Sequence, residues 1–525
     1  MKLLIATLLF ISILILTTTT MSSFGITYDE FNYFHSTDLQ IEWFVLLYKG
    51  ISTGDIKTTI SDDVIKKYWN WEPHRVPHPP FSRILSAITK SIFYPAVNLF
   101  TAYRLSVVIF FALLTCLIFL WASKIYDLST AIVSSLSFIL MPHVFGLSHI
   151  GITDIPLTFF WFASAYTFYR GLTDWRWSVI FGIVLGLAFS TKFSAFFIPI
   201  PLLVWAHIYK RRMYYNNLFS MIFLSPIIMF ATQPYLWHKT IPRLLEFMHQ
   251  SITRMDNPAT RIPTYFFHEQ LLGNQLPLYY PFFITAVSIP LSILLVVIVG
   301  IFFPFRKTPI IDIQHLLIFN TIFILIIPIL PGGTIHDGVR LLLPAFPFLA
   351  AIGGTGFFHL KEYIKNLLNS KGYSCRIKNL KTKVTTTLSI LIIIPAAIEM
   401  IDIHPNELMY YNNLVGGVKG AYALGLETTY LGEAFNKDFI DFLNRELPQN
   451  ASINASFSSN IFINYQRHGI LRKDIIVTAV DYDYYILLCR RGYMHIFDKW
   501  LFENRTPTLS WQFKGVPLIN IYKFK

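Results

Sequence analysis

The chain has 525 residues, of which 54% are hydrophobic, 17% aromatic and only 14% charged. A soluble domain is about 25% charged, so this chain has too little polar surface for a water-soluble globule and is too hydrophobic to be disordered. With 25 Gly, 28 Pro and 3 Cys, collagen-like and disulfide-rich classes are excluded as well. The composition indicates a polytopic membrane protein.

Apolar runs long enough to span a membrane recur along the chain. A hydrocarbon core of about 30 Å is crossed by about 20 helical residues. Eleven runs fit, at 3–20, 97–122, 128–148, 154–170, 177–191, 193–209, 217–236, 279–303, 314–331, 339–358 and 384–402. The first run favours a signal anchor over a signal peptide, because no small-residue cleavage site follows it.

The basic residues predict the orientation. With the N-terminus in the cytoplasm, the short cytoplasmic segments, including 359–383, carry 16 basic and four acidic residues, nearly the whole net charge of +13. This follows the positive-inside rule and leaves no need for a nucleic-acid partner. We therefore expect a multi-pass protein of the cell (inner) membrane with a cytoplasmic N-terminus.

Three polar segments then lie outside the membrane, at 21–96, 237–278 and 403–525. The first contains amphipathic stretches with Trp43 and Trp69, which predict helices lying in the membrane interface.

The tail combines one helix-period stretch with short β-rich runs. The expected elements are a helix at 433–447 and strands at Ile453–Phe457, Tyr484–Cys489 and Pro517–Phe524. The predicted fold is therefore an all-α membrane domain over 1–402 followed by a small extracytoplasmic α/β domain over 403–525.

Charged residues gather at the outer ends of the predicted spans. Asp29 and Glu30 follow the first span, and Asp154 lies between two spans. Burial and mutual repulsion suit such carboxylates to general-base work or metal ligation, although a solvated loop pair is the alternative for Asp29 and Glu30.

Three bases lie at the same level, Arg104, Lys192 and Arg340. Each is costly in a membrane span, and the positive-inside rule gives no reason for bases on the outer side. Their convergence on a phosphate would explain all three, whereas snorkelling or simple ion pairing would explain each one singly.

His74 and His78 precede Pro79-Pro80, where the first outer loop returns to the membrane. Either histidine could bind a phosphate or a metal, but the spacing of Glu72, His74 and His78 is too loose for a zinc site. No P-loop, Rossmann fingerprint or G-x-S-x-G motif is present in the sequence.

Several motifs recur in one family in this order. They are Asp29-Glu30-x-x-Tyr33, His78-Pro79-Pro80-Phe81, Tyr103-Arg104-Leu105, Thr153-Asp154-x-Pro156-Leu157, Gly186-Leu187-Ala188-x-Ser190-Thr191-Lys192 and Gly338-Val339-Arg340-x-x-Leu343-Pro344. Over about residues 20–360 the chain resembles the GT-C membrane glycosyltransferases of the protein O-mannosyltransferase and lipid A aminoarabinose transferase kind.

The resemblance implies that a sugar moves, with inversion, from a polyprenyl-phosphate donor of the undecaprenyl or dolichyl type to an acceptor on the outer face. It makes Asp29 the base that deprotonates the acceptor hydroxyl, with Glu30 orienting it or the donor and Asp154 as the second acid. Arg104, Lys192, Arg340 and His78 would bind the donor phosphate. Further candidates are Tyr33, His74, His336 and Asp337.

One position departs from the pattern. The aminoarabinose transferases carry a basic residue where this chain has Asn32, which weakens a lipid A assignment. The acceptor is left open among protein, lipid and glycan, and so is the need for a divalent cation, the one cofactor in question. Membrane lipids are further expected partners. The alternative functions are a polytopic transporter or lipid flippase, and a scaffolding membrane protein.

Overall fold

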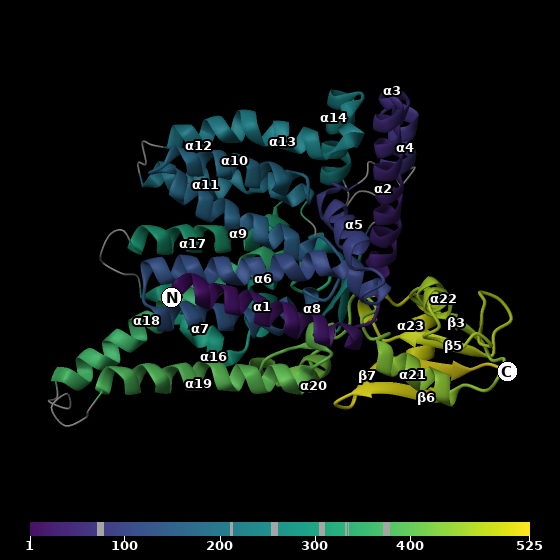
Figure 1. Cartoon of the computed structure of the whole chain (residues 1–525). Coiled ribbons are helices and arrows are strands. Elements are labelled where there is room, and N and C mark those ends of the chain that lie inside the picture. The colour runs from purple at the N-terminus through teal and green to yellow at the C-terminus, as the bar shows by residue number, and fades with distance from the viewer. Residues whose placement is uncertain are drawn as a thin grey trace.

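In the computed structural model, a bundle of nearly parallel helices carries a group of crossing helices and a small sheet domain at one end (Figure 1). The structure describes residues 1–70, 78–209, 214–253, 261–303, 310–330, 333, 335–370 and 379–525.

Within these residues, six helices are long and apolar enough to cross a membrane. They are Lys2–Ser23, Leu99–Ile125, Tyr215–Thr232, Ile310–Ile329, Arg340–Ser370 and Leu380–Ile403, counted with their flanking short turns. Four shorter apolar helices accompany them. The predicted multi-pass, mainly helical membrane domain is confirmed, while the number of spans stays a prediction.

Each predicted apolar run falls on helix. The bundle consists of α1 (Lys2–Thr20), α6 (Leu99–Ile125), α7 (Leu128–Ile139), α8 (Pro142–Leu147), α9 (Asp154–Gly171), α10 (Trp175–Phe189), α11 (Pro199–Ile208), α12 (Tyr215–Phe219), α13 (Ser225–Thr232), α15 (Tyr280–Val287), α16 (Leu291–Phe302), α17 (Ile310–Ile326), α18 (Phe346–Ser370) and α19 (Leu380–Ile403).

Two predicted runs are interrupted at proline. Run 279–303 is α15 and α16 with a break before Pro290, and run 128–148 is α7 and α8 with Pro142 opening the second helix. Proline lacks a backbone N–H and its ring clashes with the preceding turn, so the apolar run continues while the helix does not.

Glycines allow a close contact between two helices of the bundle. A Cβ on Gly356 of α18 would lie 1.9 Å from the Val296 carbonyl of α16, and one on Gly300 would lie 2.1 Å from the Ile352 carbonyl. Small residues bring membrane helices together without a hydrophobic driving force. The central α18 is therefore locked against α16, whereas α1 and α19 are mostly exposed on the periphery.

The crossing group occupies one end of the bundle. It contains α2 (Tyr28–Thr53), α3 (Ile56–Thr59), α4 (Asp62–Trp69), α5 (Phe81–Phe93) and α14 (Thr240–Ile252). The long α2 runs at a steep angle to the bundle helices (Figure 1), which is the orientation expected of interfacial helices. Trp43 of α2 packs on Trp69 of α4 with ring centroids 5.0 Å apart.

The tail forms a mixed sheet with helices, as predicted. Its five strands lie in the order β4-β3-β5-β7-β6, with β3 parallel to β4 and β5 and the remaining pairs antiparallel. The expected strands are β3 (Ser452–Ala455), β5 (Tyr484–Leu488) and β7 (Val516–Lys523), and the expected helix is α21 (Lys437–Glu446).

The sequence analysis missed β4 (Ile476–Val477), β6 (Leu509–Phe513), α22 (Ser459–Arg467) and α23 (Ile496–Asn504).

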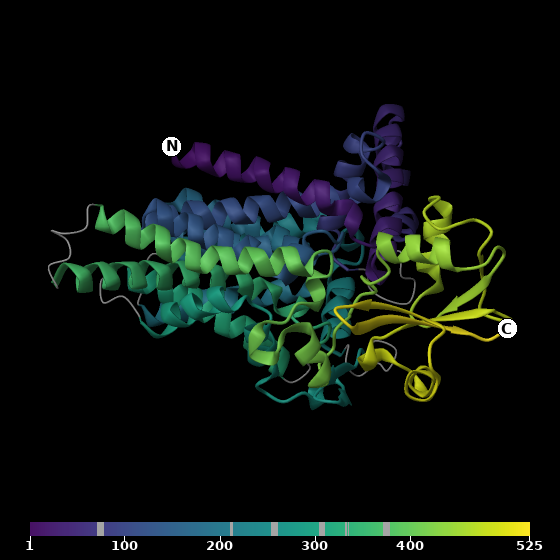
Figure 2. The same ribbon diagram turned by 90° about the horizontal axis from the view of Figure 1, so that it is seen from below.

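The sheet domain and the N-terminus lie at opposite ends of the molecule (Figures 1 and 2). The adjoining ends of α18 and α19 lie at the N-terminal end, where Lys361 forms an ion pair with Asp127. The described basic residues of α18 and the sheet domain thus lie toward opposite ends of the bundle, and which end faces the cytoplasm stays a prediction.

Candidate active site

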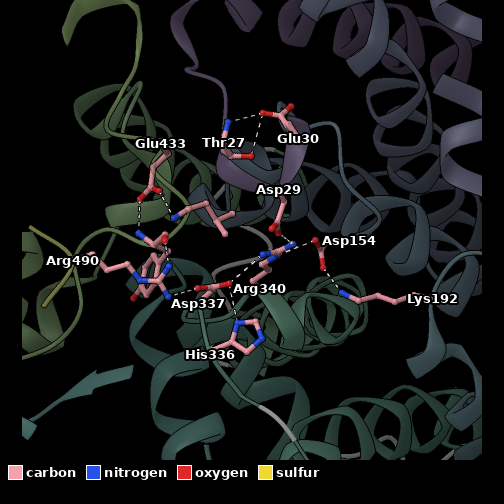
Figure 3. A network of polar contacts seen from close by, with 12 residues as sticks. Thr27, Asp29, Glu30, Asp154, Lys192, His336, Asp337, Arg340, Glu433 and Arg490 are labelled. Atoms are coloured by element: carbon pink, nitrogen blue, oxygen red, sulfur yellow. Dashed lines mark hydrogen bonds and ion pairs between the residues drawn. The ribbon is translucent and has the colours of Figure 1, made fainter. Parts of the chain in front are cut away.

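Most of the predicted site residues meet where the bundle, the crossing group and the tail adjoin (Figure 3). They come from the start of α2, the outer part of α6, the start of α9, the segment after α10 and the segment before α18. The residues brought together are Asp29, Glu30, Arg104, Asp154, Lys192, His336, Asp337 and Arg340.

Arg340 is the centre of this site. Its Nη2 lies 2.5 Å from Asp29 Oδ2, its Nε 3.1 Å from Asp154 Oδ2 and its Nη1 3.1 Å from Asp337 Oδ2. A guanidinium is planar and presents its donors in fixed directions. One arginine therefore ties together three carboxylates from three separate segments of the chain.

Asp154 joins Arg340 to a second base. It is the first residue of α9, where the helix dipole favours a negative charge. Its Oδ1 accepts a hydrogen bond from Lys192 Nζ at 2.7 Å. The Asp154 side chain is 2% exposed and that of Lys192 is 19% exposed, so the ammonium group is the accessible member of this pair.

Asp337 lies in a sharp turn before Arg340. Asp337 and Gly338 have φ angles of 56° and 60°. The Asp337 carboxylate contacts His336 Nδ1 at 2.8 Å and Arg490 at 2.7 Å in addition to Arg340. Burial alone would raise the pKa of Asp337, but His336, Arg490 and Arg340 outweigh it and hold that pKa well below the usual range. The carboxyl is therefore ionised.

Glu30 and Arg104 form a separate, fully buried pair. Arg104 Nε and Nη2 each lie 2.7 Å from a Glu30 oxygen, and the two side chains are 0% and 1% exposed. Glu30 also accepts from the Gly151 N–H at 2.6 Å, and Arg104 donates to the carbonyl of Gly25 at 2.6 Å. The pair fixes the first turn of α2 to α6 and to the loop before α9.

This geometry changes the expected role of Arg104. Its donors reach Glu30 and the carbonyls of Phe24 and Gly25, so direct contact with a donor phosphate does not fit. Glu30 likewise lies against Arg104 and backbone N–H groups. The geometry therefore gives the pair a positioning function.

Of three other predicted site residues, the structure describes Tyr33 and His78. Tyr33 follows Asp29 by one turn of α2, and the Arg83 guanidinium lies 5.5 Å from its ring. Burial raises the pKa of Tyr33, which keeps the phenol protonated. His78 lines a cavity with Trp69, Tyr235 and other residues of the crossing group. His74 lies outside the described residues.

The tail supplies a residue that the sequence analysis did not include. Arg490, which follows β5, is 5% exposed and bonds to Asp337 Oδ1 and to the carbonyl of Tyr430. The available signal was Arg490-Arg491 directly after a buried strand. The tail also contacts the start of α2, because Tyr28 N–H donates to the Leu431 carbonyl at 3.0 Å.

The described residues offer no group of three or more His, Cys, Asp or Glu side chains arranged for a metal ion. The three carboxylates around Arg340 are each paired with a base. Of the three, Asp29 has the most exposed side chain, at 30%.

Comparison with known proteins supports the resemblance drawn from the motifs. Residues 77–238 match the model of a family described as dolichyl-phosphate-mannose-protein mannosyltransferase. The matched segment includes Arg104, Asp154 and Lys192. The predicted resemblance to the GT-C glycosyltransferases is confirmed. No curated protein matches the chain.

Three solved structures are similar to this chain at 12% identity. Two are of ArnT from Cupriavidus metallidurans, bound to undecaprenyl phosphate and in the apo state, and each match covers 98% of this chain and 97% of that one, with TM-scores of 0.46 and 0.47. The third is the Archaeoglobus fulgidus oligosaccharyltransferase tethered with an acceptor peptide. This match covers 71% of this chain and 49% of that one, with a TM-score of 0.38.

Proposed function

We propose that this membrane protein transfers a sugar from a polyprenyl-phosphate donor to an acceptor hydroxyl at the site around Arg340. The observation that carries the proposal is the contact of this one guanidinium with three carboxylates, beside an accessible lysine. Residues 77–238 match a family whose description names a dolichyl-phosphate-linked sugar donor. The phosphate of such a donor is an anion that Lys192 and Arg340 could bind.

Lys192 and Arg340 bind the donor phosphate in this proposal. Lys192 supplies a compact charge with three donors, and Arg340 supplies a planar fork that matches phosphate oxygens. Both stabilise the negative charge that develops on the leaving phosphate. Asp154 holds the two bases at a fixed separation, because its oxygens contact Lys192 at 2.7 Å and Arg340 at 3.1 Å.

Asp29 acts as the general base. The acceptor oxygen forms a bond to the anomeric carbon while the bond from that carbon to the phosphate oxygen breaks. The acceptor's proton moves to the Asp29 carboxylate and then to solvent, and polyprenyl phosphate leaves with the bonding electrons. Attack from the side opposite the phosphate inverts the anomeric configuration. A positioned base of this kind contributes roughly 10²–10⁴-fold to the rate.

The reaction takes place on the side of the membrane that holds the sheet domain, which we propose is the extracytoplasmic side. The excess of basic residues in the opposite segments supports this orientation. A cysteine introduced near residue 460 should react with an impermeant thiol reagent in intact cells. One introduced in 365–370, with Cys375 replaced, should not. The reverse pattern would contradict the proposed side.

The function is tested with purified protein in nanodiscs and a panel of radiolabelled undecaprenyl- and dolichyl-phosphate sugars. The wild-type protein should release polyprenyl phosphate from at least one donor. Arg340→Ala should release it roughly 10²–10³-fold more slowly, whereas Glu42→Gln, a change at an exposed position of α2, should match the wild type. Movement of intact donor across the bilayer without cleavage would instead support the flippase alternative.

A further inference from the structure

The ionised side chains around Arg340 are balanced in charge. We call this set the Arg340 cluster, and it consists of the acids Asp29, Asp154 and Asp337 and the bases Lys192, Arg340 and Arg490. When His336, the further partner of Asp337, is neutral, three negative and three positive groups leave no net positive charge for an incoming phosphate. A buried anion is stable only where it is paired, so binding a phosphate here requires one carboxylate to withdraw.

The three carboxylates differ in how firmly they are held. Asp154 bridges Arg340 and Lys192, and Asp337 bridges Arg340 and Arg490, and both side chains are 2% exposed. Among the residues that the structure describes, Asp29 forms its ion pair with Arg340 alone, and its side chain is 30% exposed. An ion pair with a partly exposed acid costs less to break than one whose acid is fully buried. Asp29 is therefore the carboxylate that can leave.

We propose that the donor phosphate displaces Asp29 from Arg340 Nη2, and that this displacement frees Asp29 to accept the acceptor's proton. The inference rests on the proposed function and adds how its base is controlled. While Arg340 Nη2 lies 2.5 Å from Asp29 Oδ2, that carboxylate oxygen is occupied by the guanidinium and cannot face an acceptor hydroxyl. When a singly charged phosphodiester takes its place, Arg340 remains neutralised and Asp29 becomes available beside the anomeric carbon.

The main consequence is that Asp29 competes with the donor in the resting protein. Apparent affinity is reduced by the fraction of protein in the competent state, and minor states are commonly populated at about 0.1–10%. Removing the competing carboxylate should therefore strengthen the binding of a polyprenyl phosphate by roughly tenfold or more. A residue that only helped to hold the donor would give weaker binding when changed.

The experiment measures the dissociation constant of undecaprenyl phosphate in nanodiscs for the wild type, Asp29→Asn and Asp29→Ala. Both variants should bind at least tenfold more tightly than the wild type, and Glu42→Gln should bind like the wild type. Equal or weaker binding by the Asp29 variants would overturn the exchange. Circular dichroism and thermal melting establish that each variant is folded.

A second measurement uses the wild-type protein and so does not depend on variants. Carbodiimide-coupled amine labelling of carboxylates, read by peptide mass spectrometry, should increase at Asp29 when undecaprenyl phosphate is added. Labelling at Asp154, which keeps its partners, should stay low. No increase at Asp29, or a decrease, would contradict its displacement.

The outcomes separate this inference from the proposed function. If the wild type releases polyprenyl phosphate from a sugar donor but the Asp29 variants bind the lipid no more tightly, the exchange is wrong and the transferase stands. If the wild type neither binds undecaprenyl phosphate nor cleaves any donor, the proposed function fails and the exchange fails with it.

Discussion

Two neighbouring carboxylates in the first turn of α2 each face an arginine, yet the two ion pairs differ in almost every other respect. Glu30 and Arg104 are 0% and 1% exposed and share two short hydrogen bonds. Asp29 is 30% exposed and shares Arg340 with two other acids. The two pairs have similar residue types and differ in burial and in the number of partners. We infer that these two properties distinguish a positioning pair from a reactive one.

The largest expected effect is on turnover at Asp29. Asp29→Asn keeps the size of the side chain and removes the basic lone pair, so transfer should fall by roughly 10²–10⁴-fold while the melting temperature stays close to that of the wild type. Initial rates of polyprenyl phosphate release measure the effect. Near-normal transfer by folded Asp29→Asn would mean that the pair with Arg340 is only structural.

Glu30 should show the opposite pattern, because its change removes the carboxylate that neutralises the buried Arg104. Removing one member of a buried pair costs about 3–5 kcal/mol, so Glu30→Gln should lower the melting temperature strongly. The double change Glu30→Gln with Arg104→Met removes the uncompensated charge and should recover part of that loss. A Glu30→Gln variant as stable as the wild type would break the distinction between the two pairs.

Arg340 should give an intermediate effect on both binding and turnover. Losing one preorganised donor at a developing anion typically costs roughly 10²–10³-fold in rate, and Arg340→Ala should fall in this range. Arg340→Lys should recover only part, since an ammonium group cannot reach three carboxylates as a planar fork does. The separate measurement of KM and kcat checks this, and full activity with lysine would contradict the role of the fork.

The smallest effect concerns the pH dependence of stability at Glu427, a buried residue of the tail. Burial raises the pKa of Glu427 to about 7 from 4.5, although Arg490 and the Gly492 N–H act against the rise. Between these values the folded protein holds a proton that the unfolded chain has lost, so stability should fall as the pH rises from 4.5 to 7, by at most about 3 kcal/mol.

Glu427→Gln provides the matched control for this prediction. The amide does not titrate, so the decline in melting temperature of the wild type between pH 5 and pH 7 should be reduced in the variant. The two proteins should differ most above pH 7. Parallel curves would mean that Glu427 does not carry this dependence.

The sequence predicts the helical bundle from its long apolar runs. It predicts most members of the site from the charged residues that lie at the ends of those runs. A charged residue beside an apolar span is costly, so Arg104, Asp154, Lys192 and Arg340 stand out without any structure. Tyr484–Leu488 and the neighbouring strands are likewise visible as short β-rich runs. Their pairing is not visible, because which acid meets which base depends on how the spans pack.

The remaining parts of the site depend on contacts between distant segments. Arg490 reaches Asp337 across 153 positions of sequence, and no local pattern predicts that the tail folds back onto the segment before α18. The buried state of Arg104 also follows only from its contacts with Glu30 and Gly25. The helix breaks near Pro142 and Pro290 are visible in the sequence only as prolines, because hydrophobicity continues across them.

The most direct test of the account is an experimental structure of the protein in nanodiscs with undecaprenyl phosphate bound. We expect the phosphate to lie between Lys192 and Arg340, with Asp29 out of hydrogen-bond distance of Arg340. Glu30 and Arg104 should remain paired. A phosphate bound elsewhere, or bound while Asp29 keeps its 2.5 Å contact with Arg340, would contradict it.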